Sequence, residues 1–127
     1  MKPLFFALGA MLALPAAAQD ITEDLAYGLR CHFTQSCIGG GCGEETYDTL
    51  LEVDGAGATF RDAQMELPMT GGVDVATGHI SFASEPAENT SYFISTFEEG
   101  GAALSIHTLA EGQAIGITFT GACWEDK

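Results

Sequence analysis

Positively charged residues are scarce in this chain of 127 residues. Four lysines and arginines stand against 18 aspartates and glutamates, so the formal net charge at pH 7 is −14. Proteins that bind nucleic acid need a cationic stripe, and anionic lipid headgroups repel a surface of this sign. The composition therefore excludes nucleic acid and anionic membrane surfaces as partners. A basic protein, a basic peptide or a metal cation would instead be attracted, over about 8 Å at physiological salt.

Long apolar runs are equally rare. The run Leu4–Leu14 follows a single lysine and precedes a proline and three alanines. That order is typical of a secretory signal peptide, and the run is too short to span a bilayer. We expect cleavage after Ala18, so that residues 1–18 are lost and residues 19–127 form one exported domain, periplasmic or secreted, without membrane insertion. This domain keeps all the acidic residues and three cations, a formal charge of about −15.

Recognisable catalytic and cofactor motifs are missing. The sequence contains no G-x-S-x-G elbow, phosphate-binding glycine loop, H-E-x-x-H pair or EF-hand calcium loop. Its three histidines, His32, His79 and His107, lack the spacing of zinc ligands. We therefore assign no catalytic residue, no metal ligand and no cofactor. A small hydrolase with a site built from loops is an alternative that ranks behind a binding function.

Four cysteines are present, and their spacing is informative. No Cys-x-x-Cys occurs, which argues against a thioredoxin-like redox site and against c-type haem attachment. In an exported chain an even number of cysteines predicts disulfides. We favour Cys31 with Cys123, which ties the first strand to the last, and Cys37 with Cys42, which closes a small glycine-rich loop. The pairing of Cys31 with Cys42 and Cys37 with Cys123 remains open, as does a metal-bound or free-thiol state.

Apolar residues alternate with polar ones along most of the chain, as they do in half-buried strands. The clearest case is 114–123, where Ile115, Ile117 and Phe119 share one face. Strands are expected at 46–53, 58–65, 79–84, 91–97, 101–109 and 114–123, with a short one at 65–69. Pro68 restricts this short strand to an edge or an end, and the glycines of 70–73 predict a turn.

The N-terminal region of the exported chain has mixed signals. Ile21, Leu25 and Leu29 recur at helical spacing, whereas Tyr27, Leu29, Cys31 and Phe33 alternate as in a strand. We predict a helical turn within 20–29 that runs into the first strand. With about seven or eight short strands, the fold class is all-β, a single small antiparallel barrel or sandwich with two disulfides.

Acidic pairs next to glycine are the candidate partner-binding residues. These pairs are Glu44 with Glu45 and Glu98 with Glu99, and both are expected at loop tips. Trp124 directly follows Cys123 and would either cover a disulfide or anchor a partner. The predicted function is that of a binding module for a basic protein or peptide. Carriage of a small ligand inside the barrel is a further alternative.

In layout the chain is similar to the small periplasmic β-barrel inhibitors of C-type lysozyme, which are exported, disulfide-tied and of like size. The resemblance implies a cationic enzyme as partner. It does not extend to the Ser-Ala-Ser-Gly-type loop of those inhibitors, because the nearest stretch here, residues 81–86, lacks the glycine. No site residue is carried over from the resemblance.

Overall fold

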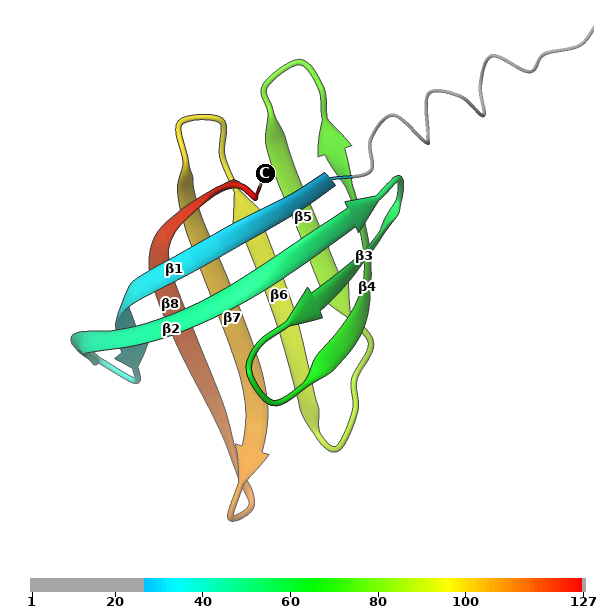
Figure 1. Ribbon diagram of the computed structural model, residues 1–127. Coiled ribbons are helices and arrows are strands. Elements are labelled where there is room, and N and C mark those ends of the chain that lie inside the picture. Colours follow the sequence, from blue (N-terminus) through cyan, green and yellow to red (C-terminus); the bar gives the residue numbers. More distant parts are fainter. Residues whose placement is uncertain (1–26, 127) are drawn as a thin grey trace, which may run out of the picture.

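The protein folds into a closed barrel of antiparallel strands in sequence order, each strand paired with the next and β8 paired with β1 (Figure 1). A computed structural model describes residues 27–126. The strands are β1 (Tyr27–Ile38), β2 (Gly41–Asp54), β3 (Gly57–Arg61), β4 (Glu66–Asp74), β5 (His79–Ser84), β6 (Thr90–Thr96), β7 (Gly101–Ala110) and β8 (Gln113–Glu125). The all-β prediction is confirmed, and of the two predicted architectures the chain adopts the barrel.

The barrel interior is filled by side chains from alternating positions of the strands. The largest of those that are fully buried are Phe33, Phe60, Phe82, Leu51, Ile94, Leu104 and Cys31. Neighbouring residues on the same strands point outward and are mostly polar or small, which is the alternation that the sequence displays. The core therefore follows directly from the period-two pattern.

Both disulfides join neighbouring strands. Cys31 of β1 is bonded to Cys123 of β8, and both residues are buried. Cys37 and Cys42 face each other across the β1–β2 hairpin and are also bonded. The favoured pairing is thus confirmed, the alternative pairing is wrong, and no cysteine is free.

Three local predictions need correction or fall outside the described residues. The turn expected at 70–73 is strand, because β4 continues through both glycines. The strand expected to reach residue 65 ends at Arg61, where Asp62 accepts hydrogen bonds from the backbone N–H groups of Gln64 and Met65 and forms a turn. Of the predicted helical turn, residues 27–29 are strand, and residues 20–26 lie outside the described residues, as does the predicted signal peptide.

Two glycines are required where strands approach closely. A Cβ on Gly71 would overlap the carbonyl oxygen of Ser81 on β5, and one on Gly121 would overlap that of His32 on β1. The neighbouring Gly72 has open space at the same position. Gly71 is therefore needed by the barrel wall, although its type suggested a turn.

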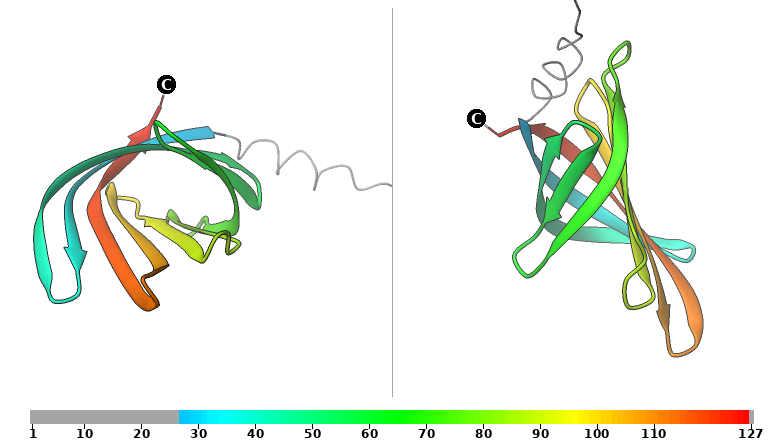
Figure 2. Two further views of the ribbon diagram at one scale, coloured as in Figure 1. Left: turned by 90° about the horizontal axis from the view of Figure 1, so that it is seen from below. Right: turned by 90° about the vertical axis from the view of Figure 1, so that its right-hand side faces the viewer.

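Only one half of β2 is paired on both sides and takes part in the closed barrel. Only Leu50–Asp54 pair with β3, whereas β1 pairs with β2 as far as Gly41. Among the described residues, no strand pairs with 41–49 of β2 on the side away from β1. Figure 2 shows this half of the β1–β2 hairpin extending past the rest of the barrel, as the β7–β8 hairpin does. Nowhere in residues 27–126 is there a helix with the length and apolarity needed to cross a membrane.

Candidate functional site

One end of the barrel forms a hollow of about 320 Å³ that combines aromatic rings with carboxylates. We call it the acidic mouth. Its floor is provided by Leu29, Ile80 and Thr96, and its rim by Tyr27, Phe97, Glu98, Trp124 and Glu125. The floor residues also belong to the barrel interior, and two of the three, Leu29 and Ile80, are apolar, whereas the edge of the mouth carries carboxylates.

Backbone hydrogen bonds hold the rim in place. The β6–β7 turn is closed by bonds from Phe97 N to Gly101 O and from Gly100 N to Phe97 O, both 2.9 Å. The N–H of Cys123 donates to Gly100 O at 2.8 Å, which fastens this turn to β8. The turn thereby brings Glu98 to the same hollow as Trp124, although the two are far apart in the sequence.

The rim is negative and partly exposed. Burial and, secondly, the charge of Glu125 raise the pKa of Tyr27, so its phenol stays neutral at physiological pH. The side chains of Phe97 and Trp124 are 42% and 48% exposed. An apolar floor with aromatic and carboxylate groups above it suits a lysine or arginine side chain, whose stem is apolar and whose head is cationic.

Both arginines of the described residues are already engaged with carboxylates. Arg30 lies opposite Trp124 in the β1–β8 register and forms a 3.2 Å ion pair with Asp126. Arg61 is paired with Glu52 and with Glu66, each at 3.0 Å. Within residues 27–126, neither guanidinium is therefore left to neutralise the acidic mouth.

The predicted residues Glu44 and Glu45 lie elsewhere, in strand β2 and not at a loop tip. They line a broad hollow of about 930 Å³ with Thr34, Gln35, Thr46, Thr120 and Gly121, which we call the bulge hollow. Its cause is an irregularity of β1 between Phe33 and Gln35, which shifts the register toward both β2 and β8. Such bulges bend a strand and re-aim its side chains.

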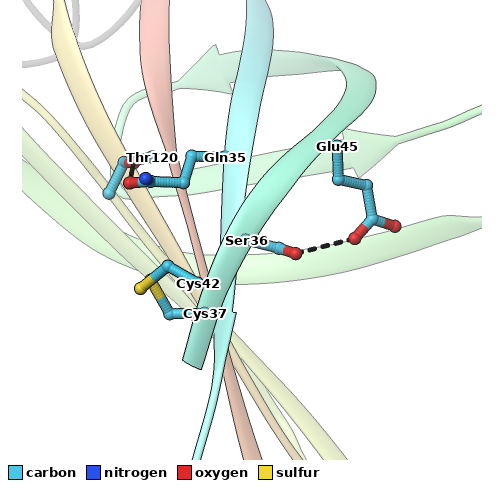
Figure 3. Close-up of a disulfide and its surroundings, with 6 residues drawn as sticks. All are labelled: Gln35, Ser36, Cys37, Cys42, Glu45 and Thr120. Atoms are coloured by element: carbon cyan, nitrogen blue, oxygen red, sulfur yellow. Dashed lines mark hydrogen bonds between the residues drawn. A yellow bond between two sulfur atoms is a disulfide. The ribbon is translucent and has the colours of Figure 1, made fainter. Parts of the chain in front are cut away.

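Figure 3 shows how the side chains divide at this hairpin. Ser36 and Glu45 point to one side, where the Ser36 hydroxyl donates a 2.7 Å hydrogen bond to Glu45 Oε1. The Cys37–Cys42 disulfide points to the other side. The structure thus brings Glu98 and Trp124 together in one hollow, places Glu44 and Glu45 in another, and leaves Glu99 in the turn outside both.

Sequence reasoning missed a hydrogen-bonded cluster around Asp62. The hydroxyl of Tyr47 on β2 donates to Asp62 Oδ2 at 2.7 Å. Burial alone would raise the pKa of Asp62, but the bonds from Tyr47, Gln64 and Met65 lower it below its usual value. Burial, this bond and the nearby charge of Asp62 raise the pKa of Tyr47. The bond links β2 to the turn after β3 at the level where the two strands no longer pair.

The histidines are distributed over separate surroundings. His32 Nδ1 lies 2.6 Å from Asp48 Oδ1 on the exposed face of β1 and β2. His79 stacks on Phe97 with ring centroids 4.6 Å apart, and His107 is exposed on β7. In residues 27–126 no three His, Cys, Asp or Glu side chains are grouped so as to hold a metal ion.

Comparison with protein-family models, curated proteins and solved structures found no match.

Proposed function

We propose that this protein is an exported acidic binding module that holds a basic segment of another protein at the acidic mouth. The observation that carries this proposal is that Glu98, Trp124 and Glu125 line one hollow, while both arginines of the described residues are paired with carboxylates. Export belongs to the proposal. It is supported by the N-terminal sequence and is compatible with two formed disulfides.

The size of the mouth favours a side chain over a whole ligand. Its volume of about 320 Å³ lies at the lower limit of pockets that enclose small molecules. The barrel interior behind it is occupied by buried aromatic and aliphatic side chains. These two observations favour capture of a protruding lysine or arginine over carriage of a small ligand.

Inhibition of a basic enzyme such as lysozyme would be one form of this function. The small barrel, the disulfides and the negative charge are consistent with that form. Hydrolysis has less support, because the described carboxylate–histidine pair, Asp48 with His32, lies on an exposed sheet face. One assay distinguishes inhibition from simple binding: the rate of the cationic enzyme is measured with and without this protein, and only inhibition lowers it.

Binding can be measured with the single tryptophan of the chain as reporter. Residues 19–127 are titrated with an oligolysine peptide, which does not fluoresce, and by calorimetry with a panel of cationic proteins that includes C-type lysozyme. We expect the emission of Trp124 to change on binding and the affinity to fall as salt rises. The absence of any binding at low salt would eliminate the proposal.

Substitutions locate the binding site. Trp124→Ala and the double variant Glu98→Gln/Glu125→Gln should each weaken binding by about tenfold, since aromatic anchors and desolvated charges dominate such contacts. Their affinities are measured by calorimetry, because Trp124→Ala lacks the fluorescent reporter. The matched control is Glu85→Gln/Glu111→Gln, which changes the net charge equally at exposed positions between strands, outside the mouth. Equal weakening by both double variants would show that only the overall charge matters and would refute the acidic mouth as the site.

A further inference from the structure

The free edge of β2, residues 41–49, is a second feature of the molecule that the acidic mouth does not use. On its inner side this segment pairs with β1, and on its outer side no strand among residues 27–126 covers it. Unpaired backbone N–H and C=O groups along a strand edge are a template for another extended chain. The rest of the barrel has closed itself and offers no comparable length of open edge within the described residues.

A hollow marks the point where this edge begins. Where β2 and β3 separate, a space of about 350 Å³ is lined by Asp48, Thr49, Leu50, Arg61, Asp62 and neighbouring residues. Thr49 is only 4% exposed, and its Oγ1 has no hydrogen-bond partner. Buried hydroxyl groups normally have a partner. An incoming strand that enters this fork would lie next to β2, and a polar side chain on its inner face could supply one.

We propose that the edge of β2 accepts an extended basic segment of a partner protein as an additional strand. The partner's backbone would pair with residues 41–49, and its lysine or arginine side chains would meet Glu44, Glu45 and Asp48. These three carboxylates occur within five consecutive positions of the edge. Backbone pairing then supplies affinity, and the charges select which strand can pair.

The same carboxylates argue against two other occupants. A second copy of the chain paired edge to edge would bring Glu44, Glu45 and Asp48 close to their own counterparts, which is unfavourable. The segment that precedes Tyr27 carries Asp20, Glu23 and Asp24 and no lysine or arginine in residues 19–26, so its net charge also opposes the edge. A basic strand from another protein is the occupant that the charges favour.

The test uses two peptides on the exported chain, residues 19–127. One is an eight-residue peptide of alternating threonine and lysine, and the other is the same peptide with every backbone amide methylated. Methylation keeps the charge but removes the backbone N–H donors from both edges of the peptide. Amide hydrogen exchange is measured with each peptide. We expect the first peptide to protect the amides of 41–49 and the methylated one to bind at least about tenfold more weakly.

Two charge variants provide an independent readout. Thr46→Lys places a cation on the open edge, whereas Thr70→Lys makes the same change on β4, where the residue is paired on both sides. Thr46→Lys should lower the affinity for the unmethylated peptide by about tenfold, and Thr70→Lys should lower it by less than about twofold. Equal binding of both peptides, protection confined to the acidic mouth, or equal effects of the two variants would overturn the edge proposal. Amide protection at the acidic mouth alone would refute the edge proposal but support the proposed function. Failure of the one can therefore be distinguished from failure of the other.

Discussion

Removing the disulfide between β1 and β8 should destabilise the protein far more than removing the one in the β1–β2 hairpin. Cys31 and Cys123 are 92 positions apart, whereas Cys37 and Cys42 are five apart. In the chain-entropy model the long crosslink contributes about 4 to 5 kcal/mol and the short one about 2 kcal/mol, because the long one restricts far more of the unfolded chain. The expected difference is thus about 2 to 3 kcal/mol.

The difference in burial between the two disulfides should also make loss of the β1–β8 disulfide the more destabilising change. Cys31 is fully buried and Cys123 nearly so, whereas Cys42 is exposed. Replacing the buried pair by alanine also removes packed sulfur atoms from the core, which adds a cavity penalty. A Cys31→Val/Cys123→Ala variant refills some of that volume. If it remains almost as unstable as the double alanine variant, the lost crosslink is the main cause.

The assay is urea unfolding of Cys31→Ala/Cys123→Ala and Cys37→Ala/Cys42→Ala, followed by circular dichroism. We expect a large fall of the midpoint for the first variant, with a steeper dependence on denaturant because its unfolded chain is more expanded. The second variant should show a smaller fall of the midpoint, the one that corresponds to a loss of about 2 kcal/mol. Equal losses for the two variants, or a larger loss for the hairpin pair, would refute the reasoning from loop length and burial.

Two further predictions concern single positions. Gly71→Ala should lower the free energy of unfolding by more than about 2 kcal/mol, because the new methyl group overlaps the backbone of β5. The neighbouring Gly72 has open space around it, so Gly72→Ala should lower that free energy by less than about 1 kcal/mol. Thermal unfolding measures both. Tyr47→Phe should cost about 1 kcal/mol at neutral pH, a figure discounted for the solvent around Asp62. Because the pKa of Asp62 is lowered in the folded state from its ordinary value of 3.8, this contribution is fully present above that value. It is lost progressively as the pH falls below 3.8 and through the lower pKa of the folded state. Equal stability of Tyr47→Phe and the parent at pH 7, with a gap that opens in acid, would contradict the assignment.

Most of the fold was predictable because one simple pattern carries it. Alternation placed Phe119 on the apolar face of its strand, and the structure buries it. Glycine-containing turns separate the last three strands. The cysteine pairing was favoured because it joins the first strand to the last, but the structure was needed to exclude the alternative pairing. Gly71 was misplaced because a glycine required by a close strand crossing has the same local signature as a glycine in a turn.

The candidate sites were less predictable, since they depend on register. Glu98 and Trp124 meet only because the β6–β7 turn is bonded to β8 through Cys123. The irregularity at Thr34 has no recognisable sequence signal, and it forms the hollow at Glu44. The turn at Asp62 could have been found, because an aspartate that accepts from the second and third following N–H groups is a familiar turn former.

The disulfide between adjacent first and last strands also determines how the molecule responds to mechanical force. A pull applied at Tyr27 and Glu125 reaches the Cys31–Cys123 bond after only a few residues on either side. The chain between the two cysteines lies outside the path of the load, so the strands from β2 to β7 are shielded while the bond is intact. Reduction would move the load onto the β1–β8 ladder, whose residue pairs would then separate in succession.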